Sequence, residues 1–207
     1  MEAESFRGGL TLEKVKKTRR QIQAEDTKNK IFKAAMQLLE QEDFDSITIR
    51  EIVRAADVSI GTFYNYYETK RDVFCQTYQI ADDYFQDEIY PQLQSLPIDE
   101  RFRFFFDAYT DYNCMVTPLT LTKIIYHPDN KNFHRHNDYG MIPILVELID
   151  QAKAELYFHT QEASEEIAQF FMVCLRGVVY DWCTCDGSYD LKHAIRQYSQ
   201  KLLKIYL

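Results

Sequence analysis

The chain has few of the residues that interrupt regular secondary structure. Its 207 residues include only 6 Gly and 5 Pro, which favours long helices joined by short connections. No apolar run approaches the roughly 20 residues that a membrane-spanning helix needs. The opening stretch MEAESFRGGL also lacks the apolar segment of a secretory signal. We therefore expect a cytoplasmic protein of one or two helical domains.

The sequence is also poor in the patterns of disulfide, metal and catalytic sites. Its five cysteines are odd in number and scattered along the chain: Cys75, Cys114, Cys174, Cys183 and Cys185. No second cysteine or histidine pair stands at zinc spacing, and the stretch HPDNKNFHRHND at 127–138 is as consistent with a solvated loop as with a metal site. The motifs GxGxxG, GxSxG and HExxH are absent. We predict no metal, no cofactor and no enzymatic activity.

Charge is distributed unevenly along the chain. The whole sequence carries a net charge of −8, but residues 1–71 have a net charge of +1 and residues 72–207 one of −9. Five basic residues fall within seven positions: Lys14, Lys16, Lys17, Arg19 and Arg20. Such a run is usually a solvated arm, but beside a DNA-binding unit it could follow phosphates or a minor groove. We therefore treat residues 1–25 as a basic N-terminal arm, disordered or helical.

Short helices with clear start signals follow this arm. Asp26 or Thr27 is expected to cap the first helix, and Thr48 with Glu51 forms a capping-box pattern before a helix over about 48–55. Ser59 is expected to cap a third helix over about 60–66. Two short helices joined by a tight turn form a helix-turn-helix, whose second helix can lie in the major groove of DNA.

The rest of the chain also has helical periodicity and no credible strand. The expected helices run from Thr69 to about Tyr90, where Pro91 ends the helix, then over 98–115, 118–127, 132–158 with a kink or break at Gly140 or Pro143, 162–184 and 189–206. The predicted fold is all-α. It combines an N-terminal three-helix DNA-binding domain at 26–71 with a helical bundle at 72–207.

Four aromatic residues crowd the segment SIGTFYNYYETK at 59–70. Phe63 and Tyr67 are four residues apart, so both are expected to face the core of the small domain. Tyr64 and Tyr66 then point outward, where their hydroxyls could donate to phosphate oxygens. Lys70, at the start of the next helix, would add a charge where the helix dipole already favours an anion.

The sequence TIREIVRAADVSIGTFYNYYETKRDVF resembles the DNA-binding signature of the TetR family of transcriptional regulators, over about residues 27–74. This resemblance implies a homodimer that places one recognition helix of each subunit in a major groove of a near-palindromic operator. Asp57 stands where the family usually has glycine, and aspartate tolerates the left-handed conformation that the turn needs. The residues expected at DNA are Thr48, Arg50, Ser59, Ile60, Gly61, Thr62, Tyr64, Asn65, Tyr66 and Lys70. Asn65 is the candidate for base reading, because a carboxamide can pair bidentately with adenine.

The resemblance also assigns roles to the larger domain. Its last two helices would form the dimer interface, with candidate residues Phe171, Cys174, Leu175, Val178 and Trp182. Its middle helices would surround a ligand pocket, with candidates Phe105, Phe106, Tyr109, Tyr112, Tyr126, His127 and Tyr139. An aromatic stripe at helical spacing is, however, more often ordinary core.

Two functional hypotheses keep DNA binding. In the first, the protein is a repressor released by a small hydrophobic or aromatic effector; in the second, the large domain docks a protein partner or the regulator activates transcription. A buried cavity would favour the first, and an exposed apolar patch the second. A third hypothesis, an enzyme or metal sensor, has little support in the sequence.

Overall fold

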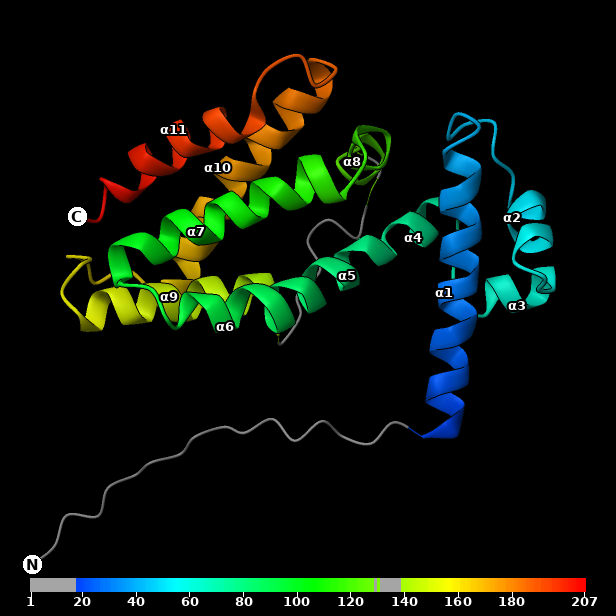
Figure 1. Ribbon diagram of the computed structural model, residues 1–207, viewed down its shortest axis with the longest axis horizontal. Coiled ribbons are helices and arrows are strands. Elements are labelled where there is room, and N and C mark those ends of the chain that lie inside the picture. Colours follow the sequence, from blue (N-terminus) through cyan, green and yellow to red (C-terminus); the bar gives the residue numbers. More distant parts are fainter. Residues whose placement is uncertain (1–17, 129, 131–138) are drawn as a thin grey trace, which may run out of the picture.

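The computed structural model describes residues 18–128, 130 and 139–207, and within these ranges every regular element is a helix. In chain order the helices are α1 (Arg19–Leu39), α2 (Ile49–Ala55), α3 (Ile60–Tyr64), α4 (Lys70–Phe74), α5 (Gln76–Tyr84), the π-helix η1 (Phe85–Ile89), α6 (Tyr90–Leu93), α7 (Ile98–Asp111), the π-helix η2 (Tyr112–Val116), α8 (Leu119–Ile125), α9 (Met141–Ala154), α10 (Ser164–Thr184) and α11 (Leu191–Leu203). Figure 1 shows an elongated molecule with α1, α2 and α3 at one end, α6, α7, α9, α10 and α11 at the other, and α8 between them. None of these helices is long and apolar enough to cross a membrane. The all-α prediction is confirmed for the part of the chain that the structure describes.

Helix α1 begins earlier than the sequence analysis predicts. Its N-cap is Thr18, not Asp26 or Thr27, since the Thr18 side chain accepts from the backbone N–H of Gln21 and the Gln21 side chain accepts from that of Thr18. This reciprocal pair is a capping box with glutamine in place of glutamate. Arg19 and Arg20 therefore lie in the first turn of a helix, while Lys14, Lys16 and Lys17 lie outside the described residues.

The starts of α2, α3 and α4 are where the sequence predicts them. Thr48 and Glu51 form a capping box at α2, Ser59 caps α3, and Thr69 forms a capping box with Asp72 at α4. The recognition helix is shorter than predicted, because α3 ends at Tyr64 rather than at residue 66. Local side-chain hydrogen bonds thus define three successive helix starts within 22 positions of the sequence.

The expected helix from Thr69 to Tyr90 is in fact four segments. Helices α4 and α5 are followed by the π-helical turn η1, and α6 then continues through Pro91 to Leu93. The prediction that Pro91 ends the helix is therefore wrong. Proline cannot donate to a carbonyl of the preceding turn, and the wider π turn directly before it has already interrupted the α-helical pattern.

Gly140 marks the beginning of α9 rather than a kink within a helix. It has φ of 91° and precedes Met141, so glycine supplies a backbone conformation that other residues rarely adopt. Pro143 falls in the first turn of α9, where a missing N–H costs nothing. The predicted break at these two residues is thus a helix start, and residues 131–138 before it lie outside the described part.

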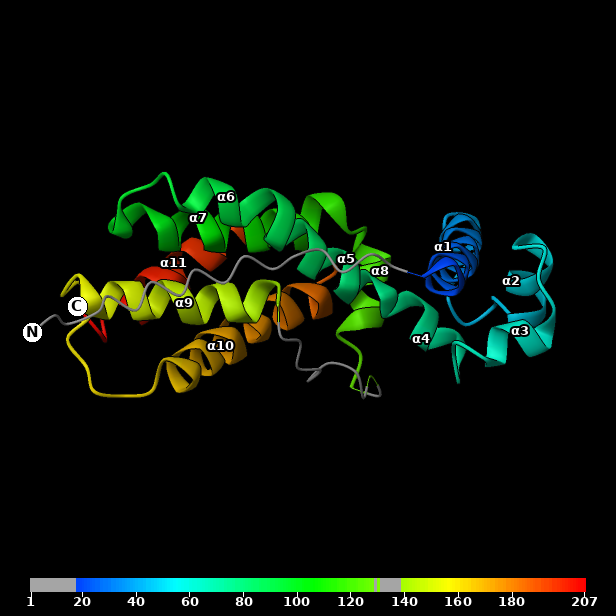
Figure 2. The ribbon, with the colours of Figure 1, turned by 90° about the horizontal axis from the view of Figure 1, so that it is seen from below.

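The hydrophobic interior has two parts. The larger lies in the bundle, where α11 sits between α7 on one side and α10 on the other (Figure 2). The smaller lies in the N-terminal domain formed by α1 to α4, which we call the head, around Phe63 and Phe74. It is completed by residues from much later in the chain, Leu121, Ile124 and Ile125 of α8, all buried. Helix α8 therefore packs against the head and links it to the bundle.

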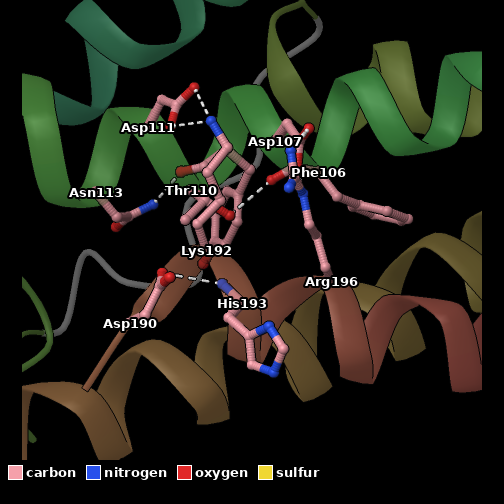
Figure 3. Close-up of polar contacts among 10 residues, drawn as sticks. Phe106, Asp107, Thr110, Asp111, Asn113, Asp190, Lys192, His193 and Arg196 are labelled. Atoms are coloured by element: carbon pink, nitrogen blue, oxygen red, sulfur yellow. Dashed lines mark hydrogen bonds and ion pairs between the residues drawn. The ribbon is translucent and has the colours of Figure 1, made fainter.

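Two ion pairs tie α7 to α11 (Figure 3). Lys192 Nζ lies 2.7 and 2.8 Å from the two carboxylate oxygens of Asp111, and Arg196 forms two parallel bonds of 2.8 and 2.6 Å with Asp107. Asp190 caps α11 by accepting from the N–H of His193 at 3.0 Å. Partly exposed pairs of this kind contribute little to stability, because water screens the two charges. The apolar packing holds the two helices together, and the ion pairs fix their relative position.

Candidate DNA interface and effector cavity

The turn between α2 and α3 adopts the conformation that a helix-turn-helix requires. Asp57 has φ of 53°, in the left-handed region, which confirms the expectation from the sequence. The N–H of Val58 then donates to the Val53 carbonyl at 3.0 Å and closes the end of α2. The side chain of Ser59 starts α3 by accepting from the N–H of Thr62 at 3.0 Å.

The aromatic residues of the recognition segment divide between core and surface as the sequence predicts for Phe63, Tyr67 and Tyr64, but Tyr66 packs partly against the core of the head. Phe63 is fully buried, and Tyr67 is nearly so, with its hydroxyl donating to Gln76 Oε1 at 2.6 Å. Tyr64 is 56% exposed and its ring packs edge-on against Phe63. Tyr66 is half-buried, with the ammonium of Lys28 6.0 Å from its ring centre. The buried pair holds the segment, and Tyr64 is left on its outer face.

The remaining residues expected at DNA lie on the outside of the head. Thr48, Arg50, Ser59, Gly61 and Asn65 are exposed, Thr62 is half-buried, and Ile60 is 48% exposed. Ile60 is an apolar side chain at the first position of α3, where it is available for contact with an apolar group such as a thymine methyl.

Gly61 has no structural reason to be glycine. A Cβ added there would meet only the Ser59 hydroxyl, at an ordinary contact distance of 3.7 Å. Glycine within a helix costs about 1 kcal/mol relative to alanine. A position that the fold would allow to be alanine, on the outer face of the recognition helix, favours close approach of another molecule.

Lys70 has a different environment from the one predicted. Its ammonium donates to the carbonyls of Phe44, Asp45 and Ile47 at 2.6, 3.1 and 2.8 Å. It also lies 4.5 Å from the centre of the Phe44 ring, on which the Arg71 guanidinium packs at 4.7 Å. All three N–H groups of Lys70 thus have acceptors within the protein, and the lysine holds the segment between α1 and α2 against α4.

A cavity of about 70 Å³ lies between α5, α7, α8, α9 and α10. Its lining residues are Thr77, Tyr78, Ala81, Asp82, Phe85, Tyr109, Tyr112, Asn113, Thr117, Ile125, Tyr126, Met141, Ile142 and Arg176. The hydroxyls of Tyr109 and Tyr126 are 2.7 Å apart, and that of Tyr112 donates to the Thr77 carbonyl at 2.8 Å. Burial raises the pKa of Tyr109 to about 12 and that of Tyr126 well above its ordinary value. Both phenols therefore keep their protons at neutral pH.

Three of the seven residues expected around a pocket line this cavity: Tyr109, Tyr112 and Tyr126. Phe105 and Phe106 instead pack in the bundle core, against Phe85 and Phe171. His127 is exposed, and Tyr139 donates to Asp83 at 3.1 Å.

The sequence analysis did not find Arg176, although a single arginine in the apolar stretch VCLRGVV of α10 was the available signal. The histidine-rich stretch falls largely in 131–138, outside the described residues. Elsewhere no group of three His, Cys, Asp or Glu is arranged to hold a metal.

Comparison with known proteins identifies the head. The family model of bacterial regulatory proteins of the tetR family matches residues 31–76, from the second half of α1 to the start of α5. The head is therefore a tetR-family domain.

Solved structures show that nearly the whole chain shares its fold with known regulators. FadR from Thermus thermophilus, a transcriptional repressor in complex with lauroyl-CoA, matches with a TM-score of 0.70 at 20% identity, over 85% of this chain and 92% of that one. The fatty acid degradation regulator FadR from Bacillus halodurans gives 0.63 at 22% identity, over 86% and 94%. NalD of Pseudomonas aeruginosa, the secondary repressor of a multidrug efflux pump, gives 0.59 at 15% identity, over 90% and 98%. No curated protein sequence matches the chain.

The last two helices, α10 and α11, have one apolar face inside the subunit and another outside. Of the residues expected at the dimer interface, Phe171, Leu175, Val178 and Trp182 are buried within the subunit itself, and Cys174 is half-buried. The exposed face of α10 carries Phe170 (38% exposed), Val173 (55%), Gly177 and Tyr180 (46%). On α11, Tyr198 is 50% exposed. The surface free to meet a partner is therefore made by residues next to the expected ones.

Proposed function

We propose that the protein is a dimeric transcriptional repressor, without catalytic activity of its own, that leaves its operator when a small molecule enters the cavity beside Tyr109. The observation that carries this proposal is the outer face of α3, where Ile60, Tyr64 and Asn65 are exposed on a helix held in place by buried Phe63. Such a protein works in the cytoplasm, where its DNA is.

The DNA contacts we propose fall into two groups. Tyr64, Arg50 and Tyr66 reach phosphates and fix the position of the head without reading sequence. Asn65 and Ile60 contact base edges, through a carboxamide and an apolar group respectively. Ser59, Gly61 and Thr62 are small and allow α3 to approach closely, and Thr48 flanks them at the start of α2. Lys70 contributes mainly by holding the head together.

We propose that two subunits pair through the exposed faces of α10 and α11. Phe170, Val173, Tyr180 and Tyr198 supply apolar area, and a Cβ at Gly177 would meet nothing within 4 Å, so the partner's helix can approach closely there. A two-fold axis through this face would present two recognition helices to successive major grooves, about 34 Å apart. A protein effector would need an exposed apolar face of this kind to bind to. Dimerisation would cover this face and leave it inaccessible to such an effector.

The cavity is connected to the DNA-binding head through the last turn of α8. Tyr126, which follows that turn, shares a hydrogen bond with Tyr109 of α7. Two residues earlier in the chain, the Ile124 carbonyl accepts from Arg71 of α4 at 3.1 Å, and Ile125 packs in the core of the head. A ligand that separates Tyr126 from Tyr109 would thus move the surface on which the head rests. Repression is lost if the ligand binds the displaced arrangement more tightly.

The first test is selection of bound sequences from random DNA duplexes, followed by measurement of affinity for the selected operator. We expect a near-palindromic motif. Asn65→Ala should cost on the order of 1–3 kcal/mol and relax the preference at one position of each half-site. Tyr64→Phe is the matched comparison, because it should weaken binding to all duplexes equally. An Asn65→Ala protein with an unchanged motif would show that another residue reads the bases.

A further inference from the structure

Two residues of opposite charge line the cavity at different places. Arg176 of α10 and Asp82 of α5 are the two charged residues among those that line it. The Asp82 carboxylate accepts from the N–H of Met141 at 3.3 Å, and its charge contributes to a raised pKa of Tyr112, for which burial is the main cause. Asp82 therefore acts on the part of the cavity near Tyr112.

Arg176 acts on a different set of hydroxyls. Burial raises the pKa values of Tyr78, Tyr109 and Tyr126, and the positive charge of Arg176 offsets part of that rise for all three phenols. Arg176 lines the same cavity as Tyr109 and Tyr126, whose hydroxyls are hydrogen-bonded to each other. Because these phenols stay protonated, this part of the cavity combines a permanent cation with two O–H groups able to donate.

The remaining wall is apolar. Ala81 and Phe85 of α5 contribute to it, together with Ile125, Met141 and Ile142. A molecule that fits both the apolar wall and the region around Arg176 has an apolar body and a polar end group rich in hydrogen-bond acceptors. A carboxylate is the most suitable end group, because a guanidinium binds its two oxygens in a fixed geometry and phenols can donate to the remaining lone pairs.

We propose that the effector is an organic carboxylate whose acid group binds between Arg176 and the hydroxyls of Tyr109 and Tyr126. This proposal rests on the function proposed above and names the class of molecule that the cavity takes. The carboxylate exchanges the Tyr109–Tyr126 hydrogen bond for bonds to itself, while its apolar body lies along Ala81 and Phe85.

The cavity is so small that a ligand cannot bind without moving the helices that form its walls. A cavity of about 150 Å³ is known to hold benzene, whereas this one measures about 70 Å³. Even a single ring must therefore push the walls apart. Two of those walls carry Tyr109 on α7 and Tyr126 after α8, so the acid would enter at the same place that links the bundle to the head.

The test uses the full-length dimer and isothermal calorimetry, which needs no operator. The probes are benzoate and octanoate, their neutral amides, benzylamine, and octanoyl coenzyme A, in which the carboxylate is masked as a thioester. We expect at least one of the two acids to bind at least about tenfold more tightly than its amide. Arg176→Gln should remove that difference, while Arg103→Gln, an exposed arginine on α7, should preserve it.

Several results would overturn the proposal. These are tighter binding of an amide, the amine or the thioester than of the acids, binding of neither acid, or an Arg176→Gln protein that still prefers the acid. Thermal denaturation of both variants shows whether they fold, and Arg176→Lys provides a second variant that keeps the charge. Operator selection is a separate measurement, so a protein that binds acids but no DNA would refute the proposed function and leave the carboxylate site standing.

Discussion

Replacement of Lys70 shows whether this lysine contacts DNA phosphate or stabilises the head. A lysine at this position of a recognition unit suggests a phosphate contact, yet its ammonium donates to three backbone carbonyls between α1 and α2. Lys70→Met keeps the aliphatic stem and removes only the charge and its donors. The two roles then predict different losses.

If Lys70 acts inside the protein, the variant loses stability. Each hydrogen bond is worth about 1 kcal/mol net, and the contact with the Phe44 ring adds about 0.5–1 kcal/mol. We expect a loss of about 3 kcal/mol in the free energy of unfolding, somewhat below the full sum because the bond to Asp45 is exposed. In a chain of this length that corresponds to a melting temperature lower by roughly 6–12 °C.

If Lys70 contacts phosphate instead, the loss appears in the salt dependence of DNA binding. Each phosphate contact contributes about 0.9 to the slope of log K against log salt concentration. A dimer that loses two such contacts should show a slope less steep by about 1.8. Both quantities can be measured on one preparation, by thermal denaturation and by operator titration at several salt concentrations.

Lys33→Met is the matched control, because Lys33 is an exposed lysine on the same head. We expect it to leave the melting temperature nearly unchanged. The internal role for Lys70 would be refuted if Lys70→Met melted with the wild type and its salt slope fell by the full amount. A stability loss with an unchanged slope would support it.

Substitutions at Asp57, Glu51 and Val173 test three other features. Asp57→Gly should raise the stability by about 1 kcal/mol, since glycine adopts φ of 53° without strain, and Asp57→Val should lower it; equal melting of the two would contradict this reading. Hydrogen bonds from Thr48 lower the pKa of Glu51, so its stabilising effect is present above its ordinary value of 4.5 and is lost as the pH falls through the lowered value. The difference in melting between wild type and Glu51→Gln should therefore shrink below pH 4.5, and a constant difference would count against the capping box. Val173→Asp should yield monomers in sedimentation and abolish operator binding, whereas Leu156→Asp, at a residue 74% exposed, should leave the dimer intact.

The sequence was sufficient to predict the head in detail because its signals are local. Thr48, Ser59 and Thr69 each cap a helix by contacts with residues three positions away, and such pairs can be recognised without knowing the rest of the fold. Thr18 and Gln21 form the same kind of pair. They were missed because the basic run around them indicated an arm.

The bundle was less predictable because a helical stripe does not specify what it faces. Helix α10 is apolar on more than one side, and periodicity cannot decide whether Phe171 or Phe170 turns toward the subunit's own core. The same limit applies to α7, where Phe105 packs inward and Tyr109 lines the cavity. Whether a residue of α7 packs in the core or lines the cavity depends on where α5, α8 and α10 lie. These helices are distant from α7 in the sequence, so local patterns do not reveal their positions.

The contribution of α8 to the core of the head limits how such regulators can be recombined. A graft of the head onto another regulatory bundle, cut after the end of α4 at Phe74, would leave behind Leu121, Ile124 and Ile125. The transplanted head would then have an uncovered apolar surface around Phe74, and the Arg71 guanidinium would lose the Ile124 carbonyl. A chimaera that keeps both specificity and response should carry a host α8 whose last turn reproduces these three side chains.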